Sequence, residues 1–301
     1  MLRPLMRMSD RAESAAVEEF ERHRRHLTGL AYRMLGSLAE AEDAVQEAWL
    51  RWQAAARGTV ESPRAFLSTI VTRLCLDQLK SARVRRETYV GPWLPEPVLD
   101  TAALNAESAA ELAHDLSVAL MLTLERLSPL ERAAFLLHDV FDMDFAAIAA
   151  TLSRSEAACR QLAKRARAHV AAARPRFRAS PEEGERLCAA FRQAAASGDA
   201  AAMARLLAAD AVLLSDGGGK RLTALNPIRG ADKIARFFAG IARKQELTRW
   251  RVRYATINGL PGLIAAGPDG DIRTTALAIE EGRVSAIYIV RNPDKLSRIT
   301  L

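Results

Sequence analysis

The sequence predicts a multidomain protein in which two all-α domains are followed by an α+β domain. Through most of residues 15–178, apolar side chains recur at the three- and four-residue spacing of amphipathic helices. After Pro181 come further helical segments, and then four apolar segments separated by Gly, Pro and Asp turns, at residues 248–257, 263–266, 272–279 and 284–290. Helices followed by consecutive strands indicate an α+β domain with a curved antiparallel sheet.

The charge of the chain indicates a polyanionic partner. The net charge of the 301 residues is +7. Residues 154–178 contain eight basic residues and one acidic residue, Glu156. Such clustering favours phosphate contacts more strongly than the total charge does.

The cysteines and the hydropathy argue against other classes of protein. Cys75, Cys159 and Cys188 lie in apolar helical contexts without metal-ligand spacing, so we expect buried thiols and neither a metal nor a cofactor. No apolar run reaches the ~18 residues of a membrane span, and the N-terminus lacks the apolar stretch of a secretory signal. We therefore expect a cytoplasmic protein without a membrane partner.

Residues 128–170 predict a helix-turn-helix. Ser128, Pro129 and Glu131 form a capping box with proline at the first helical position. Asp144 can cap a second, short helix, and a turn at residues 153–155 precedes a third helix that begins near Glu156. The third helix is apolar on one face and basic elsewhere, which favours a DNA-recognition helix over an ordinary solvated face.

The first half of the chain offers two more candidate surfaces. The helix at residues 40–52 has an acidic outer face that carries Leu50, which is either an ordinary exposed leucine or the centre of a protein contact. The helix that begins at Pro63 turns basic toward its end, where it could follow a nucleic-acid backbone or simply complement its own dipole. Residues 1–14 are expected to be frayed or flexible.

Three segments resemble bacterial extracytoplasmic-function sigma factors. Residues 31–52, AYRMLGSLAEAEDAVQEAWLRW, and 62–83, SPRAFLSTIVTRLCLDQLKSAR, resemble sigma region 2. Residues 128–149, SPLERAAFLLHDVFDMDFAAIA, with the following RQLAKRAR resemble region 4. Many family members have Asn in place of Arg73, which leaves the details of the contact with the promoter −10 element open. Many also have Gly near Ser153 in the turn, a mild departure because serine is tolerated in turns.

The resemblance implies a role for each surface. The acidic face would dock on the coiled coil of the β′ subunit of core RNA polymerase through Asp43, Gln46, Glu47 and Leu50. Promoter DNA at the −10 element would meet Gly58, Thr59, Val60, Glu61, Ser62, Arg73, Asp77, Lys80 and Arg83, with one base flipped out of the duplex. The −35 element would be read by Ser155, Arg160, Gln161, Lys164, Arg165 and Arg167.

The C-terminal part resembles the SnoaL-like domains of the NTF2-like superfamily, which form a cone with a cavity. One sigma-factor subgroup combines this domain with three motifs and is understood to be regulated in cis by it. The motifs are a linker WLPEP (Trp93, Leu94, Pro95, Glu96, Pro97), DGGGK (Asp216, Gly217, Gly218, Gly219, Lys220) and NPDKL (Asn292, Pro293, Asp294, Lys295, Leu296). Independently of the resemblance, a Trp-Leu pair among prolines indicates a docking element more than a bare spacer.

These interpretations predict five segments and a non-enzymatic function. The segments are a flexible start at 1–14, sigma region 2 at 15–85, a linker at 86–112, region 4 at 113–178 and a regulatory SnoaL-like domain at 183–301. The expected function is promoter recognition, DNA melting and transcription initiation with core polymerase. Alternatives are a SnoaL-like isomerase or cyclase with a DNA-binding appendage, a plain helix-turn-helix repressor, and a sigma factor whose cavity binds a small molecule.

Overall fold

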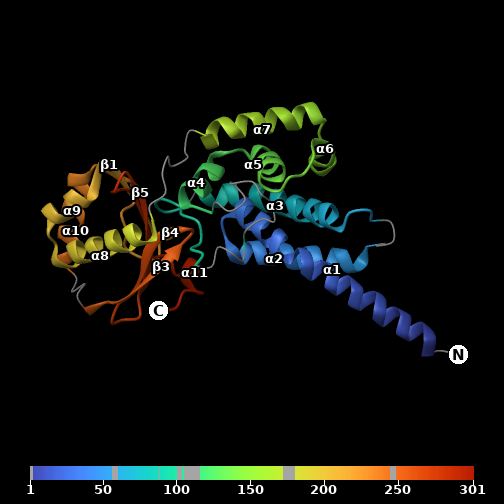
Figure 1. Ribbon diagram of the computed structural model, residues 1–301, viewed down its shortest axis with the longest axis horizontal. Coiled ribbons are helices and arrows are strands. Elements are labelled where there is room, and N and C mark those ends of the chain that lie inside the picture. Colours follow the sequence, from blue (N-terminus) through green and yellow to red (C-terminus); the bar gives the residue numbers. More distant parts are fainter. Residues whose placement is uncertain are drawn as a thin grey trace. The chain divides into compact units, whose positions relative to one another are not determined.

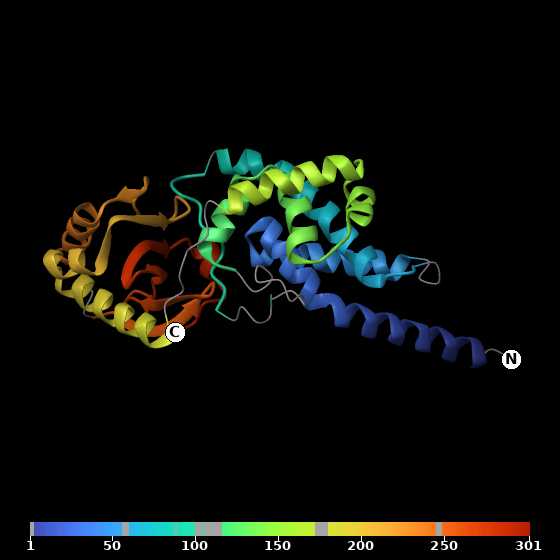
Figure 2. The ribbon, with the colours of Figure 1, turned by 45° about the horizontal axis from the view of Figure 1, so that its top comes forward.

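The computed structural model describes residues 3–55, 60–87, 89–99, 104, 116–171, 180–244 and 249–301, with the backbone alone for 3–12 and 81–87. The chain forms two compact units (Figures 1 and 2). The first consists of residues 1–84, 101–116 and 120–173, and the second of residues 85–100, 117–119 and 174–301. In the part of the chain that is described, no helix combines the length and the apolar composition that crossing a bilayer requires.

The described residues of the first unit form helices joined by turns. Its helices are α1 (Arg3–Leu35), α2 (Leu38–Ala54), α3 (Pro63–Glu87), α4 (Val118–Arg126), α5 (Pro129–Phe135), the π-helical turn η4 (Leu136–Val140), α6 (Phe145–Leu152) and α7 (Glu156–Ala171). The flexibility expected for residues 1–14 stays a prediction, and the backbone is helical from Arg3, where α1 begins. Each residue added to an existing helix gains a hydrogen bond, and the Leu, Met and Arg residues of this segment favour the helix.

The predicted helix-turn-helix is confirmed residue by residue. Ser128 and Glu131 make both hydrogen bonds of the capping box, and the side chain of Asp144 accepts a hydrogen bond from the amide of Ala147. Ser153 adopts the left-handed conformation with φ 54°, and α7 begins at Glu156. The short polar side chain of serine makes this conformation less unfavourable than a branched residue would.

The second unit packs three helices on a six-stranded sheet. Its elements are α8 (Pro181–Ser197), α9 (Ala200–Leu206), β1 (Leu207–Asp216), β2 (Ile228–Arg229), α10 (Ala231–Ala242), β3 (Arg251–Ile257), β4 (Leu260–Ala266), β5 (Ile272–Glu280), β6 (Arg283–Val290) and α11 (Pro293–Leu296). The sheet order is β2-β1-β6-β5-β4-β3. The predicted antiparallel sheet is therefore wrong at one place, because β1 and β6 run parallel. The chain between them crosses over through α10, which is the type of connection that parallel neighbours require.

The helices α8, α9 and α10 gather on one face of this sheet (Figure 1). Since side chains alternate along a strand, Leu277 and Ile279 of β5 and Ile287 and Ile289 of β6 point to the helices and join their core. The intervening residues point to the opposite face. That second face is also buried, because Ala276, Ala278, Tyr288 and Val290 are at most 8 % exposed.

Candidate functional site

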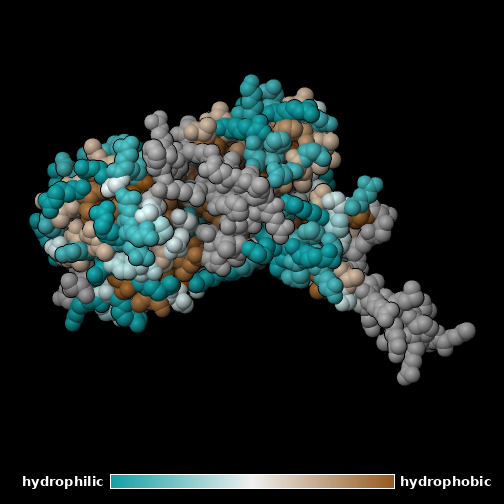
Figure 3. Space-filling view, viewed as in Figure 1, coloured by the Kyte–Doolittle hydropathy of each residue, from teal (hydrophilic) through white to brown (hydrophobic). Residues whose placement is uncertain are grey.

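The outer face of α7 is the candidate surface for reading DNA. Cys159, Leu162 and Ala166 are buried and anchor the helix in the first unit. Ser155 lies at its N-terminus, where the side-chain Oγ accepts a hydrogen bond of 3.2 Å from the amide of Ala158. Hydrophilic side chains gather along this helix (Figure 3). The exposed predicted residues are Ser155, Arg160, Gln161, Lys164, Arg165 and Arg167.

The basic residues of α7 differ in how far they are tied to neighbouring acidic groups. Arg165 Nε donates to Glu131 Oε1 at 2.7 Å, and Arg167 Nε donates to Asp139 Oδ1 at 2.6 Å. Arg160 pairs with Glu156 one turn earlier in α7, at 2.6 Å. Within the residues that the structure describes, Lys164 makes no ion pair. Arg165 and Arg167 are therefore held toward the preceding helices, whereas the ammonium group of Lys164 remains free for a phosphate.

The predicted docking face lies on the outer side of α2. Its inner side buries Ala44, Val45 and Ala48. Leu50 is 52 % exposed, and Glu47 pairs with Arg51 at 3.1 Å. Asp43 and Gln46 are also exposed. An exposed leucine beside carboxylates is suited to a basic partner with an apolar centre.

The residues predicted to meet the −10 element are spread over several environments. Gly58, Thr59 and the side chain of Arg83 lie outside the described residues. Val60 is half-buried, Glu61 is exposed, and Ser62 Oγ accepts a hydrogen bond from the amide of Ala65 at the start of α3. Asp77 and Lys80 are exposed and pair with each other at 2.8 Å.

Arg73 has a partner that the sequence did not indicate. Its guanidinium donates to the carbonyl oxygens of Ala150 at 2.9 Å and Thr151 at 3.1 Å, at the C-terminal end of α6. One turn earlier in α3, the hydroxyl groups of Thr69 and Thr151 are 2.8 Å apart. A cation at the end of a helix satisfies carbonyl groups that have no partner within that helix. In this structure Arg73 therefore joins α3 to α6.

The second unit brings WLPEP, DGGGK and NPDKL together around Asp216. The Asp216 side chain is fully buried. Its Oδ1 accepts hydrogen bonds from Tyr89 Oη at 2.6 Å and from the amide of Gly218 at 3.0 Å. Its Oδ2 accepts from the amide of Leu94 at 2.9 Å and from Lys295 Nζ at 2.8 Å. One buried carboxylate thus binds all three motifs.

Further contacts among the three motifs surround the carboxylate of Asp216. Lys295 Nζ also donates to the carbonyl of Leu94 at 2.5 Å and lies 4.4 Å from the centre of the Trp93 ring. Asn292 Nδ2 donates to Tyr89 Oη at 2.9 Å. The site tolerates little added bulk, because a Cβ at Gly218, where φ is +60°, would lie 2.3 Å from the Asn292 side chain. Lys220 pairs with Asp294 at the exposed edge, at 2.7 Å.

The linker then runs along the second face of the sheet. Leu94, Pro95, Glu96, Pro97 and Val98 are all buried. The backbone of Val98 exchanges two hydrogen bonds with Asn258, of 2.8 Å and 3.1 Å. The predicted docking element is therefore part of the second unit. Pattern reasoning missed Tyr89 and Asn258, although an aromatic residue shortly before Trp93 and an Asn-Gly turn were visible signals.

Tyr89 is held as a neutral donor at this site. Burial raises the pKa of its phenol, and the hydrogen bond to Asp216 raises it further. Ionising the phenol would place two negative charges together in a buried site, which is unfavourable. Tyr89 therefore keeps its proton at physiological pH and donates a hydrogen bond to Asp216.

Five residues of the C-terminal domain are conceivable acid–base or anion-stabilising groups of an isomerase, namely Asp210, Asp216, Tyr254, Arg273 and Tyr288, but they do not lie in one site. Asp216 and Tyr288 lie on the linker side of the sheet. Asp210 and Tyr254 are exposed. Of this group, Arg273 alone lines the cavity on the helical side of the sheet, and the described residues of that lining include no Asp, Glu or His. A general base for proton abstraction is thus missing from the described wall.

Comparisons with known proteins cover nearly the whole chain. The family model of sigma-70 region 2 matches residues 20–85, and that of sigma-70 region 4 matches residues 117–170. The ECF RNA polymerase sigma factor SigJ of Mycobacterium tuberculosis is 42 % identical over 295 residues, 93 % of each chain. The probable sigma factor SigI of the same species is 30 % identical over 276 residues, 91 % of this chain and 92 % of the relative. The crystal structure of SigJ matches with a TM-score of 0.73 at 39 % identity, over 93 % of this chain and 98 % of that chain.

Proposed function

The chain belongs to the extracytoplasmic-function sigma factors of RNA polymerase, which act in transcription initiation, and from this premise we propose that it binds core RNA polymerase and places it on promoter DNA. The protein itself makes and breaks no bonds, and the polymerase performs the chemistry. The observation that carries the promoter part is the exposed polar face of α7, where Gln161 and Lys164 face solvent and Arg160 is exposed but paired with Glu156 of the same helix. A helix of this kind enters the major groove and reads base edges with its outer side chains.

We assign the −10 element to residues 58–62 and to α3, with Lys80 and the C-terminal half of the helix near the DNA backbone. Exposure of Glu61, Ser62 and Lys80 supports this assignment. Arg73 enters the contact only after its hydrogen bonds to α6 break. The −10 function therefore includes separation of α3 from α6.

Core polymerase binding is assigned to the outer face of α2. The proposal rests on Leu50, which is 52 % exposed beside the exposed side chains of Asp43 and Gln46. We place the partner surface on the β′ coiled coil. Burying a leucine contributes about 1.5 to 3 kcal/mol, enough to make it a main source of affinity.

The test is binding of the full-length protein and its variants to purified core RNA polymerase. We expect L50D to weaken binding at least tenfold. The matched control is V17D, which changes an apolar residue that is 40 % exposed on α1 and is expected to bind like the unaltered protein. Equal loss in both variants would indicate damage to the fold, whereas full binding by L50D would remove α2 from the interface.

We further propose that the C-terminal domain regulates the sigma regions in cis through the linker. Three contacts support it: Asp216 with Leu94, Lys295 with Leu94, and Asn258 with Val98. The chain between regions 2 and 4 is thereby attached to the C-terminal domain rather than left as a free spacer. Any change in these contacts changes the freedom of the two promoter-binding regions.

A further inference from the structure

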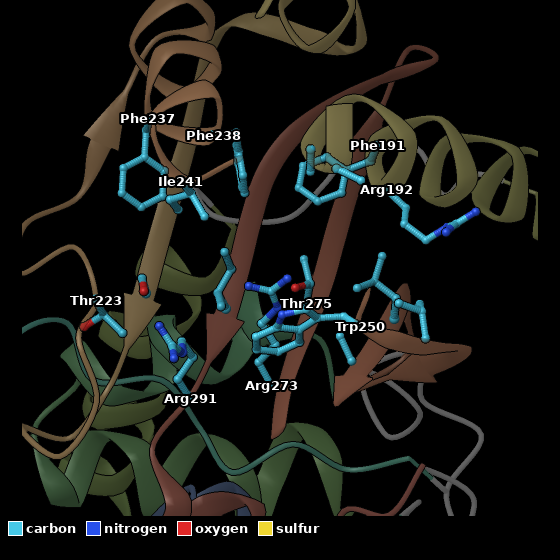
Figure 4. Close-up of a pocket in the computed structure, with 18 of the residues that line it drawn as sticks. Phe191, Arg192, Thr223, Phe237, Phe238, Ile241, Trp250, Arg273, Thr275 and Arg291 are labelled. Atoms are coloured by element: carbon cyan, nitrogen blue, oxygen red, sulfur yellow. The ribbon is translucent and has the colours of Figure 1, made fainter. Parts of the chain in front are cut away.

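The second unit contains a cavity of about 620 Å³ between its helices and its sheet. Figure 4 shows Phe191, Phe237 and Phe238 from α8 and α10 on one side, and Trp250 and Arg273 on the other. This volume lies within the range of roughly 300–1,000 Å³ that is typical of small-molecule sites. An apolar body of that size would be enclosed by aromatic rings.

The charge of the cavity has one sign. Its described lining contains five basic residues and no carboxylate. The basic residues are Arg192, Arg236, Lys244, Arg273 and Arg291. A cationic ligand would meet only like charges here, so the wall selects for an anion.

Arg273 is the basic residue best placed to hold that anion. Its guanidinium carbon lies 4.1 Å from the centre of the Trp250 ring, within the range of a cation–π contact. Among the residues that the structure describes, it donates no hydrogen bond. Arg291, in contrast, is already bound to Asp271 at 2.5 Å and to the carbonyl of Leu222 at 2.7 Å. The planar fork of Arg273 therefore remains available for the two oxygens of a carboxylate.

The surroundings of Arg273 make an anion more favourable still. Burial first, and then the charge of Arg291, lower the pKa of Arg273 to about 10. The carboxylate of Asp271 opposes this shift but contributes less than burial or Arg291, and the group remains charged at neutral pH. The hydroxyl of Thr275, two residues along β5 and on the same face, offers a further polar contact (Figure 4).

We propose that this cavity binds a carboxylic acid with an apolar body, whose carboxylate pairs with Arg273 and whose body lies among Phe191, Phe238 and Trp250. Carboxylic acids with an alkyl body and those with an aromatic body both fit this description. The probes below distinguish the two kinds of ligand.

The test is calorimetric titration of the full-length protein with decanoate and with 1-naphthaleneacetate. Their matched neutral and cationic partners are 1-decanol, 2-(1-naphthyl)ethanol and decyltrimethylammonium. We expect at least one carboxylate to bind no less than tenfold more tightly than the alcohol with the same body, and the ammonium compound not to bind. The carboxylate that binds more tightly identifies the kind of body.

Three variants connect the selectivity to the residue. R273Q is expected to bind the carboxylate and the alcohol equally, and R273K to retain part of the preference. R251Q, which removes an exposed arginine outside the cavity lining, is expected to bind like the unaltered protein. The proposal is overturned if no probe binds, if alcohol and carboxylate bind equally to the unaltered protein, or if R273Q keeps the preference. No polymerase is involved, so the result is independent of the proposed sigma function.

Discussion

At the scale of single residues, Asp216 explains why three distant motifs occur together. Its carboxylate has no contact with solvent, so each oxygen needs donors from the protein. Each oxygen has two, supplied by Tyr89, Gly218, Leu94 and Lys295. A buried charge with four donors fixes one arrangement of the chain, because any other would leave it without partners.

Lys295 and Lys220 provide a direct comparison of a buried and an exposed ion pair. We expect K295M to lower the free energy of opening of the C-terminal unit by about 3 kcal/mol or more, since it leaves Asp216 buried without its cation. The pair between Lys220 and Asp294 is more than half exposed on both sides, so K220M should cost no more than about 1 kcal/mol. The measurement is amide hydrogen exchange in β6. Equal effects of the two variants would contradict the central role of Asp216.

His26 makes the stability of the first unit depend on pH. Its Nε2 lies 2.9 Å from Ser68 Oγ, and burial lowers its pKa to about 3. The unfolded chain takes up a proton below about pH 6.5, whereas the folded chain does not until about pH 3. The contribution of neutral, buried His26 to the free energy of unfolding is therefore fully present above about pH 6.5 and is lost as the pH falls toward about 3.

The corresponding variant is H26Q, compared with the unaltered protein by urea unfolding followed by circular dichroism. Between pH 7 and pH 5 we expect the unaltered protein to lose about 2 kcal/mol more than H26Q does. S68A removes the hydrogen bond without removing a titrating group, so it should lose stability at both pH values and keep the pH dependence. An identical pH dependence in H26Q would show that His26 is not responsible.

At the scale of elements, α7 and α3 each combine a promoter-binding assignment with contacts inside the first unit. Arg165 and Arg167 of α7 are paired with Glu131 and Asp139, and Arg73 of α3 is bonded to α6. Such residues must first break an ion pair or a hydrogen bond within the protein before they can contact DNA. The residues without partners are therefore expected to dominate the contact with phosphate.

This distinction predicts different salt dependences for two variants of α7. K164Q should reduce the slope of log K against log salt by about 0.9, the amount expected for one lost phosphate contact. R167Q should leave the slope nearly unchanged, because its guanidinium is already paired with Asp139. The measurement is fluorescence anisotropy of holoenzyme on a promoter duplex enriched from genomic DNA. A larger effect of R167Q than of K164Q would reverse the assignment.

At the scale of the whole molecule, the linker between sigma regions 2 and 4 is the segment through which we propose that the C-terminal domain acts. Residues 85–100 belong to the same compact unit as residues 174–301. The prolines keep this segment extended, so it lies flat on the sheet face that the helices leave uncovered. Regulation in cis therefore needs no separate docking site.

The prediction at this scale concerns transcription with purified core polymerase. We expect D216N, and removal of residues 292–301, to change promoter-directed transcription while binding to core polymerase is retained, because both changes remove contacts of the linker. D210N alters an exposed carboxylate on the same strand and should transcribe like the unaltered protein. Unchanged transcription by D216N and by the truncated protein would refute regulation through the linker.

The sequence by itself determined the elements and the order of the domains. Capping at Ser128 and Asp144 and the turn at Ser153 are local, since the side chain and its partner lie within a few residues, and all three were predicted correctly. Apolar spacing and turn residues likewise located four of the six strands, β3 to β6, but not β1 and β2. The motifs WLPEP, DGGGK and NPDKL were also recognised, although only as separate segments.

Tertiary structure alone decided which distant groups meet. Three of the four donors of Asp216 follow from no local pattern, because Tyr89, Leu94 and Lys295 lie 127, 122 and 79 residues from it along the chain. The same holds for Arg73, whose two partners lie 77 and 78 residues away. The parallel pairing of β1 with β6 was missed for the same reason: a strand's alternation shows which face is buried but not which strand lies beside it. The position of Arg273 in an aromatic cavity, without a hydrogen-bond acceptor among the described residues, likewise became visible only once the helices were placed on the sheet.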